Sequence, residues 1–368
     1  RYRLDRLTEA NHTILHELAA MGGKDYYAAP LSMAIGRPAA LTFTTDRPEG
    51  FSDGDLEKFH RLMDYLAPII ESRIEHRLST TLLDTYLGRI VGEQILEGRI
   101  KRGDGQAINA VLWFSDLRDF TGLNERLPAG EMLGVLNNYL QLVGDALAAN
   151  GGEILKFIGD GVMAFWGAPT LLEDHALRSC LAALRIRHGM DAMNARWAEQ
   201  GLKPLRVRVG IHSDAVLVGN IGSKKRMDYT IIGDGVNLAA RLESACKQYA
   251  ARILISEFTQ KKLRGTYRMR EIDLVVVKGK TKPVGVYEIL DYHSEETFPN
   301  LMDVVNQFND GVAKYRAARW DAAIKAFQEA LRLNPNDKLS EIYIQRCETL
   351  KANPPEGTWD GVWVMEEK

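Results

Sequence analysis

Three short frames in this sequence combine residue types that could act together on a phosphate-bearing substrate. Asp116 lies in FSDLRDFT, and Lys156 and Asp160 lie four positions apart in KFIGDGVMAFWG. The third frame, YTIIGDGVNLAARLE, supplies Asn237 and Arg241. Two carboxylates can hold divalent metal ions, and an amide and a guanidinium one helical turn apart can reach the same group. The combination predicts chemistry on a nucleotide triphosphate.

Displacement at phosphorus explains why these residue types occur together. Mg²⁺ usually takes one or two carboxylates together with phosphate oxygens, and Asp116 and Asp160 could provide them. Two metal ions would assist both the attacking and the leaving oxygen. The planar, permanently charged guanidinium of Arg241 could meet negative charge that builds on the phosphoryl oxygens. Taken singly, however, Asp116 could cap a helix, Lys156 could pair with Asp160, and Asn237 and Arg241 could be ordinary helix residues.

The composition is typical of a soluble globular protein with two or three domains. Hydrophobic residues make up 45% and charged residues 26% of the 368 residues. A formal net charge of −2 gives no sign of a nucleic-acid surface, and no apolar run approaches the roughly 18 residues that span a bilayer. Three single cysteines, Cys180, Cys246 and Cys347, argue against a disulfide framework or a zinc site and predict a cytoplasmic protein. Because the sequence begins with Arg1 rather than Met, we expect a fragment, with room upstream for a sensor domain.

Residues 1–78 predict a small α/β unit. Segments 25–35 and 37–45 are typical of two strands joined by a turn at Gly36, and apolar residues recur at helical spacing from Leu56 to Ile70. This order resembles the C-terminal half of a GAF domain whose first half is missing or very short. A packing or dimerisation element is the alternative to a regulatory ligand site.

Residues 79–104 predict a second helical stretch. Apolar residues form one stripe between Leu82 and Ile95, and three glycines weaken the segment as an isolated helix. The stretch is expected either to carry a signal between domains or simply to connect them.

Residues 105–292 contain all three frames and predict an α+β domain. We expect a buried strand, an amphipathic helix, a hairpin, a long helix and two strands, in that order, at 110–117, 132–147, 153–167, 177–197, 205–212 and 216–221. ARILISE and EIDLVVVKG predict further strands. The order β-α-β-β-α-β with extra strands predicts a fold of ferredoxin-like type.

Residues 300–368 predict a small helical tail. Five residues fit the spacing of the tetratricopeptide pattern: Gly311, Ala323, Phe327, Ala330 and Pro335. The match is partial, because Gln307 and Asp310 stand at the Trp and Leu positions of that pattern. One such repeat cannot bury its own apolar face, so we expect it to pack against another part of the protein. Trp359 and Trp363 are expected to pack back onto the body.

The three frames in this order resemble the class III nucleotidyl cyclases, the adenylate and guanylate cyclase family. The resemblance covers residues 110–289, and FSDLRDFT, KFIGDG and GDGVNLAAR form a specific joint signal although each alone would be weak. It implies a homodimer whose active sites lie at the interface between two catalytic domains.

The resemblance assigns the metal and transition-state roles position by position. It implies that Asp116 and Asp160 bind two Mg²⁺ or Mn²⁺ ions per site, with the Leu117 carbonyl as a further ligand. Asn237 and Arg241 match the pair that stabilises the transition state. One protomer would supply the acids, and its partner would supply the other residues.

The resemblance also assigns substrate contacts. Lys156 matches the lysine that selects adenine, and Thr230 stands where many relatives have Asp, as in the subgroup that includes bicarbonate-responsive soluble cyclases. Lys278 matches the lysine that contacts the terminal phosphates, with Lys280 as the fallback. Lys156 can donate to adenine N1, and Thr230 can donate or accept near N6, which favours ATP over GTP.

These roles predict an adenylate cyclase that converts ATP to 3′,5′-cyclic AMP and pyrophosphate by in-line attack of the ribose 3′-hydroxyl. A guanylate cyclase is the alternative within the class. A catalytically silent nucleotide-binding scaffold that passes signals through residues 79–104 is the alternative outside it. No nucleic-acid partner and no membrane segment are expected.

Other features have simple structural explanations. GGEIL at 151–155 lacks the acidic residue and Phe of the GGDEF signature and predicts a turn, and SKKRMD at 223–228 predicts a solvated loop. His212 is interpreted as a strand residue, and the alternation of Arg206 and Arg208 as one exposed strand face. Asp214 replaces a Gly that is common in the family, at a predicted turn.

Overall fold

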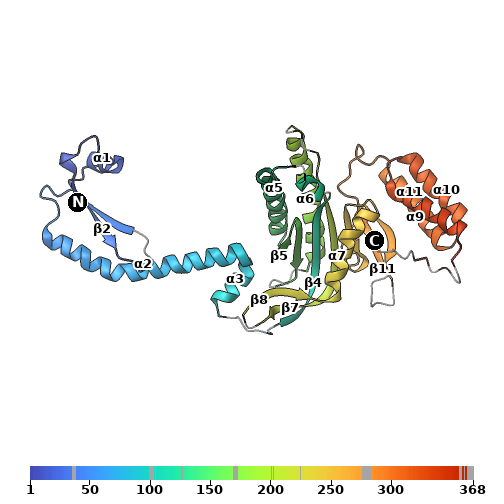
Figure 1. The fold of residues 1–368 in the computed structure, drawn as a ribbon, viewed down its shortest axis with the longest axis horizontal. Helices are drawn as coiled ribbons and strands as arrows, with labels where there is room; N and C mark the ends of the chain where they lie inside the picture. The colour runs from blue at the N-terminus through green and yellow to red at the C-terminus, as the bar shows by residue number, and fades with distance from the viewer. Residues whose placement is uncertain are drawn as a thin grey trace. The chain divides into compact units, whose positions relative to one another are not determined.

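The computed structural model describes residues 1–34, 39–98, 103, 105–118, 120–125, 127–168, 173–199, 201, 203–223, 225–275, 283–355, 359 and 361–362. The predicted turn at Gly36 lies outside them. The chain forms two compact units, Arg1–Gly98 and Arg99–Lys368 (Figure 1). Within the described ranges, every helix is too short or too polar to span a bilayer.

The first unit combines a three-stranded antiparallel sheet with helices. Its elements are β1 (Tyr2–Arg3), the 3-10 helix η1 (Leu4–Arg6), α1 (Thr13–Ala20), β2 (Asp25–Leu31), β3 (Ala39–Thr45), α2 (Asp53–Leu87) and α3 (Arg89–Leu96). The strands pair in the order β1-β2-β3. Both predicted strands and the helix after them are therefore confirmed.

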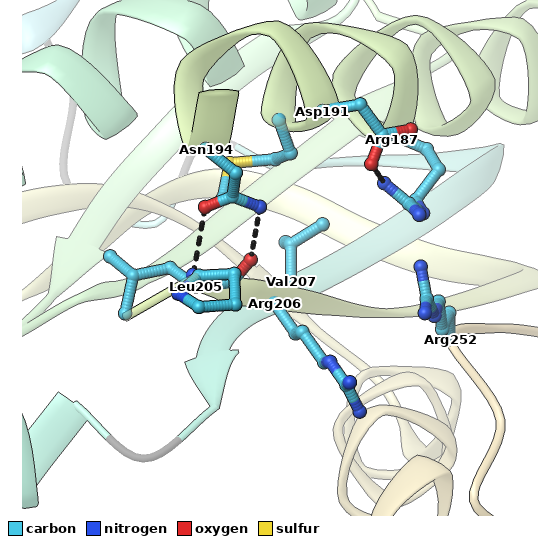
Figure 2. A pocket seen from close by; sticks show the side chains of 9 residues that line it. Arg187, Asp191, Asn194, Leu205, Arg206, Val207 and Arg252 are labelled. Carbon is cyan, nitrogen blue, oxygen red and sulfur yellow. Dashed lines mark hydrogen bonds and ion pairs between the residues drawn. The ribbon is translucent and has the colours of Figure 1, made fainter. Parts of the chain in front are cut away.

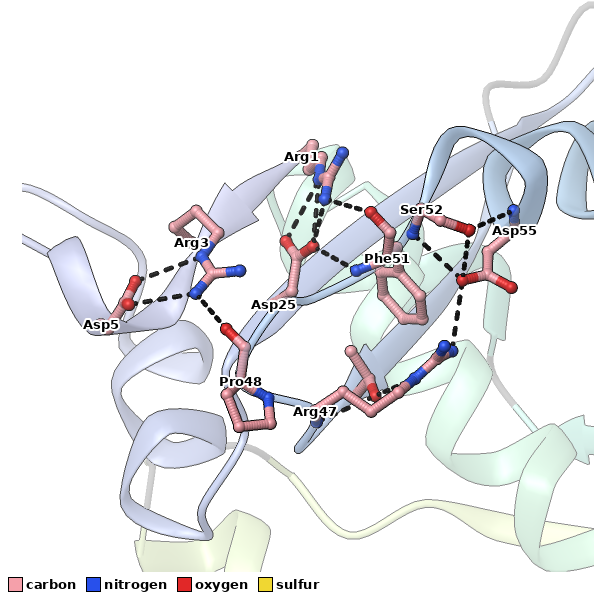
Figure 3. A network of polar contacts seen from close by, with 10 residues as sticks. Arg1, Arg3, Asp5, Asp25, Arg47, Pro48, Phe51, Ser52 and Asp55 are labelled. Atoms are coloured by element: carbon pink, nitrogen blue, oxygen red, sulfur yellow. Dashed lines mark hydrogen bonds and ion pairs between the residues drawn. The ribbon is translucent and has the colours of Figure 1, made fainter.

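A buried carboxylate ties this sheet to the start of α2 (Figure 3). Asp25 is fully buried, accepts a hydrogen bond from the Phe51 amide at 2.9 Å and pairs with the Arg1 guanidinium at 2.6 Å. Ser52 and Asp55 then exchange side-chain-to-backbone hydrogen bonds in a capping box. The end of the loop before α2 is thus held by hydrogen bonds at Phe51 and by the capping box at Ser52.

Helix α2 is one helix where the sequence predicted two helical stretches. It runs through Pro68 and continues to Leu87, and it ends at Gly88, whose φ of +82° favours glycine. The predicted division between 1–78 and 79–104 therefore falls inside a single helix, and the first compact unit extends past it to Gly98.

The second unit is built on an eight-stranded sheet in the order β10-β11-β9-β7-β4-β6-β5, with β8 paired to β7. Its strands are β4 (Gly105–Arg118), β5 (Glu153–Ile158), β6 (Gly161–Trp166), β7 (Arg206–Gly222), β8 (Met227–Ile232), β9 (Ile253–Ser256), β10 (Met269–Val275) and β11 (Val284–Ile289). Its helices are α4 (Phe120–Asn124), α5 (Ala129–Ala149), α6 (His175–Glu199), α7 (Asp234–Gln248), α8 (Glu257–Gln260), α9 (Leu301–Arg316), α10 (Trp320–Leu333) and α11 (Lys338–Ala352).

Helices cover both faces of this sheet (Figure 1). Val111 and Trp113 of β4 pack into a core with α5 and α6. The alternate residues Ala110 and Leu112 share a core with Ala239 of α7. The order β4-α5-β5-β6-α6-β7 confirms the predicted α+β class and its β-α-β-β-α-β sequence of elements.

Strand β7 corrects one prediction. The sequence suggested two strands, 205–212 and 216–221, with a turn near Asp214, but β7 continues through this position. Asp214 stands opposite Ala110 in an unbroken antiparallel ladder between β4 and β7. Because β4 satisfies the backbone groups on this side, pairing outweighs the local turn preference of Asp and its neighbours.

The helical tail shares a core with the sheet, as expected for a repeat that cannot bury its own face. Phe308, Phe327 and Tyr343 of α9, α10 and α11 pack with Leu242 of α7 and Val286 of β11. The Trp359 indole donates a hydrogen bond to the Tyr315 carbonyl at 3.1 Å. Trp359 therefore packs back as predicted, whereas Trp363 lies outside the described residues.

Candidate active site

The two predicted metal-binding acids lie side by side where strand β4 ends and the turn joins β5 to β6. Asp116 is near the end of β4, and Asp160 is in the tight turn between β5 and β6. The Leu117 amide donates a hydrogen bond to Asp160 Oδ2 at 3.2 Å, which links the two segments directly. Antiparallel pairing of β4 with β6, from Ser115 opposite Val162 onward, sets this arrangement.

The carboxylate of Asp160 is held in an unfavourable setting. Burial, together with a hydrogen bond and repulsion from Asp116, raises the pKa of Asp160 to about 7. Burial also raises the pKa of the Tyr139 phenol, and the negative charges of Asp116 and Asp160 nearby raise it further. Negative charge is thus concentrated here and incompletely neutralised by the protein.

An arginine and a third acid complete the cluster. Arg208 donates a hydrogen bond to Asp116 Oδ2 at 2.7 Å, and its Nε lies 2.9 Å from Glu243 Oε1. Arg208 stands directly opposite Asp116 in the β4–β7 ladder. Burial raises the pKa of Glu243, while Arg208 opposes that shift.

Close helix packing brings Glu243 to this position. An added Cβ at Gly210 would collide with the backbone of Ala239 and Glu243, so only glycine lets α7 approach β7 this closely. An added Cβ at Gly235 would lie 2.7 Å from the Asp214 Cβ. The glycines therefore set α7 directly on the strand.

Arg208 and Glu243 belong to the site although the sequence did not predict them as site residues. The interpretation of Arg206 and Arg208 as one exposed face is wrong for Arg208, whose side chain is only 16% exposed. The available signal was the alternation of basic residues on the strand that pairs with Asp116, but its meaning depends on the register. His212, by contrast, is a buried strand residue as expected, with Nδ1 2.7 Å from the Ser256 hydroxyl.

The acidic pair fits a divalent ion that completes its coordination with other ligands. Within the described part of the chain, no group of three or more His, Cys, Asp and Glu side chains is arranged to hold a metal. Mg²⁺ is commonly held by one or two carboxylates, with substrate phosphates and waters as the other ligands. Two adjacent acids with one raised pKa match that donor set, since a cation would relieve their repulsion.

The other predicted residues lie on separate elements. Lys156 is exposed on β5, and Thr230 is half-buried on β8, opposite Gly219 of β7. Asn237 is exposed and Arg241 half-buried on α7. Among the described residues, no hydrogen bond or ion pair joins these four side chains to Asp116 or Asp160 in the same chain. Lys278 and its alternative Lys280 lie outside the described residues.

Comparison with known proteins gives a consistent result. The model of the adenylate and guanylate cyclase catalytic domain matches residues 105–291. The chain is 34% identical over 249 residues to the terminal-differentiation specific adenylate cyclase of Dictyostelium discoideum, covering 67% of this chain and 12% of that protein. It is 28% identical over 291 residues to adenylate cyclase 1 of Rhizobium meliloti, covering 77% of this chain and 44% of that protein.

Solved structures show the same fold. A bacterial light-regulated adenylyl cyclase superposes with a TM-score of 0.53 at 24% identity, over 66% of this chain and 70% of that chain. The chain spans less than half the length of both curated relatives. Because the match of the family model covers the whole sheet from β4 to β11, the chain belongs to the adenylate and guanylate cyclase family.

Proposed function

We propose that this protein is an adenylate cyclase that converts ATP to 3′,5′-cyclic AMP and pyrophosphate. The observation that carries the proposal is the close pair of Asp116 and Asp160, in which burial and mutual repulsion raise one pKa to about 7. Curated relatives from D. discoideum, R. meliloti and Anabaena cylindrica are named adenylate cyclases, which favours ATP as the substrate.

Asp116 and Asp160 would bind two Mg²⁺ or Mn²⁺ ions, with the Leu117 carbonyl as a further ligand. When bound, the ions would activate the 3′-hydroxyl and offset charge on the triphosphate. Arg208 holds Asp116 in place by its 2.7 Å hydrogen bond, and Glu243 in turn holds Arg208. Arg208 and Glu243 thus position Asp116 and need not touch the substrate.

Cyclisation forms a bond between the ribose O3′ and the α-phosphorus and breaks the bond from that phosphorus to the oxygen shared with the β-phosphate. Pyrophosphate and the 3′-hydroxyl proton leave. Arg241 would meet the charge that builds on the α-phosphoryl oxygens, and Asn237 would orient the ribose and phosphate beside it. Removing such an electrostatic donor typically costs about 10² to 10³ in rate.

The orientation of α7 supports a site completed by a second copy of the chain. Successive residues turn by about 100° around a helix, so Arg241 and Glu243 face nearly opposite sides of α7. Glu243 faces Arg208 and the acids of its own chain. Arg241 therefore faces away from them and would serve the acids of the partner.

Exposed apolar residues provide a surface for that partner. Phe157 and Ile158, next to the Asp160 turn, are 52% and 53% exposed. Leu217 and Ile232, paired across β7 and β8, are 44% and 52% exposed. Apolar patches on a folded surface commonly mark protein contacts, so we infer a homodimer through the catalytic domain.

The remaining contacts concern the base and the terminal phosphates. Lys156 would donate to adenine N1, and Thr230 would contact N6, as in the subgroup with Thr at this position. Lys278 would bind the terminal phosphates.

We place the protein in the cytoplasm and regard α9–α11 as a partial tetratricopeptide unit. An added Cβ at Gly311 would lie 2.5 Å from Phe327 Cε1, as expected where a small residue of one helix receives the aromatic ring of the next.

Mixing two inactive variants tests the shared site. Asp116→Ala and Arg241→Ala should each reduce cyclic AMP formation by at least about 10²-fold. Mixed after subunit exchange, they should recover part of the activity, because one site of each mixed dimer keeps both residues. Cross-linking of differently tagged subunits verifies the exchange. Mixed dimers with no recovery would contradict the shared arrangement.

Comparing ATP with GTP as substrates tests the base specificity. With Mn²⁺, the wild-type chain should form cyclic AMP from ATP much faster than cyclic GMP from GTP. Faster turnover of GTP would instead identify a guanylate cyclase, and no turnover of either nucleotide would favour the silent scaffold.

A further inference from the structure

A separate cavity of about 210 Å³ lies between the second half of α6 and the start of β7 (Figure 2). Arg187 and Asp191 approach it from α6, Arg206 from β7, and Arg252 from the segment before β9. None of the residues proposed above to act on ATP lines it. It is therefore distinct from the acidic pair.

The charges around this cavity are unbalanced. Among the described residues that line it, three are arginines and one is an acid, which leaves a net charge of +2. Asp191 pairs with Arg187 one helical turn away. The side chain of Arg187 is 13% exposed, and its Nε is buried without a hydrogen-bond partner among the described residues.

Arg252 is a half-buried cation with no counter-charge in direct contact among the described residues. Within the described parts of the chain, its guanidinium makes no hydrogen bond or ion pair. Its contact is with the Tyr292 ring, whose centroid lies 5.8 Å from Arg252 and 5.6 Å from Arg187. Burial and the neighbouring Arg187 lower the pKa of Arg252. Even partial removal of a charge from water is unfavourable unless an opposite charge or hydrogen bonds compensate it.

Other polar groups at the cavity already form hydrogen bonds within the protein. The Asn194 amide donates to the Leu205 carbonyl and accepts from the Leu205 amide, both at 2.8 Å. These bonds fix the wall between α6 and β7, as Figure 2 shows. The Arg252 carbonyl accepts from the Val209 amide at 2.8 Å, which fixes the backbone of Arg252 as well. The unsatisfied donors are thus presented by a rigid frame.

We propose that this cavity binds a phosphate group, either as free inorganic phosphate or as part of a small phosphate ester. A phosphate monoester carries about −1.5 to −2 charges at neutral pH, which matches the excess of +2. Guanidinium groups bind phosphate oxygens through paired hydrogen bonds, which would satisfy Arg187 Nε and Arg252. The volume admits a phosphate with a few further atoms.

Calorimetric titration of the full chain tests the site. The buffer contains neither divalent metal nor nucleotide, so that the acidic pair stays repulsive toward anions. Wild-type protein should bind inorganic phosphate with one site per chain. The dissociation constant should rise by about tenfold or more in Arg252→Met and in Arg187→Met, because each variant removes a charge-assisted pair of hydrogen bonds.

A matched control lies on the same helix. Arg185 is exposed on α6 and does not line the cavity, so Arg185→Met removes one positive charge without touching the site. It should leave the dissociation constant within about twofold, as expected for a charge in solvent. An equal loss in Arg185→Met would mean that only overall charge matters and would overturn the proposal.

Titrations with other ligands distinguish inorganic phosphate from a phosphate ester. Tighter binding of glycerol 3-phosphate than of inorganic phosphate would identify a phosphate ester, and the reverse would identify the free ion. No binding of either, or undiminished binding to Arg252→Met, would overturn the proposal, and so would acetate binding as tightly as phosphate. If Arg252→Met fails to fold, Arg252→Lys keeps the charge but loses the paired donors, and unchanged phosphate binding in that variant would also overturn it. Because no step requires ATP turnover, the result is independent of the proposed cyclase activity.

Discussion

Two charged clusters of the second unit differ in whether each of their acids contacts an arginine, and we call a cluster balanced where each acid does. At the junction of the sheet with the helical tail, Arg270 donates to Glu288 at 2.9 Å and to Asp337 at 2.8 Å, and all three residues are buried. In the cluster that contains Asp116 and Asp160, Arg208 pairs with Asp116 and with Glu243, whereas no ion pair between Asp160 and an arginine is present among the described residues.

The same contrast holds for the second aspartate of each region. Asp273 at the junction accepts hydrogen bonds from Arg346 and the Tyr249 hydroxyl, so its charge is offset within the protein. Asp160 accepts a hydrogen bond from the Leu117 amide, but the charged group that most affects its pKa is the carboxylate of Asp116. Balanced clusters hold elements together, whereas an unbalanced cluster is a candidate to bind a ligand that supplies the opposite charge.

The largest expected effect comes from Asp160→Asn. Cyclic AMP formation should fall by at least about 10²-fold, because a metal-binding carboxylate is lost. The metal-free protein should nevertheless melt at the same or a higher temperature at pH 8. The pKa of about 7 in the folded state lies above the ordinary value of 3.8, so ionising this group destabilises the fold, and Asn removes that cost.

The control for this variant is Asp174→Asn. Asp174 is exposed and pairs with exposed Arg178, so both activity and melting temperature should stay close to wild type. Retained activity in Asp160→Asn would remove the main support for the proposed function.

A large loss of stability is expected at the balanced cluster. Asp273→Asn removes one charge of the buried pair between Asp273 and Arg346, and breaking a buried pair in this way typically costs about 3–5 kcal/mol. Urea unfolding followed by tryptophan fluorescence should report it, since Trp359 packs on Tyr315 of the tail.

An exposed pair in the tail provides the comparison for Asp273→Asn. Glu329 pairs with Arg332 on the surface of α10, where solvent screens the pair, so Glu329→Gln should reduce stability far less than Asp273→Asn does. Equal losses in the two variants would show that balance within the core does not distinguish the clusters.

Sequence patterns predicted the elements that carry the site better than the contacts within it. The Asp116 and Asp160 frames each adjoin a strong strand pattern, and the β5–β6 hairpin pairs with β4, which brings the acids together. Arg208 could not be assigned in the same way, because its role depends on its register opposite Asp116 and on the approach of α7 at Gly210.

Long-range burial explains the other differences. The junction residues Arg270 and Asp337 are charged and far apart in sequence, so no local pattern marks them as buried partners. Asp214 favours a turn locally but lies in a strand because β4 pairs with it. Helical periodicity predicted a helix after the two strands, but nothing local indicated that α2 continues unbroken to Leu87.

The smallest expected effect concerns the pH dependence of stability near the arginine-rich cavity. His293 packs between the Tyr292 and Phe298 rings, and its Nδ1 lies 3.2 Å from the Thr297 hydroxyl. Burial lowers its pKa to about 4, with smaller contributions from Arg252, Arg187, Arg270 and Arg268. Because the folded pKa lies below the ordinary 6.5, the unfolded chain binds this proton first, so His293 contributes stability above pH 6.5 that is lost as the pH falls toward 4. In His293→Gln, the drop in melting temperature between pH 7 and pH 5 should be smaller by about 2–4 °C. His188→Gln, at an exposed position of α6, should keep the wild-type drop. An unchanged drop in His293→Gln would show that burial and the surrounding arginines do not lower the pKa of His293.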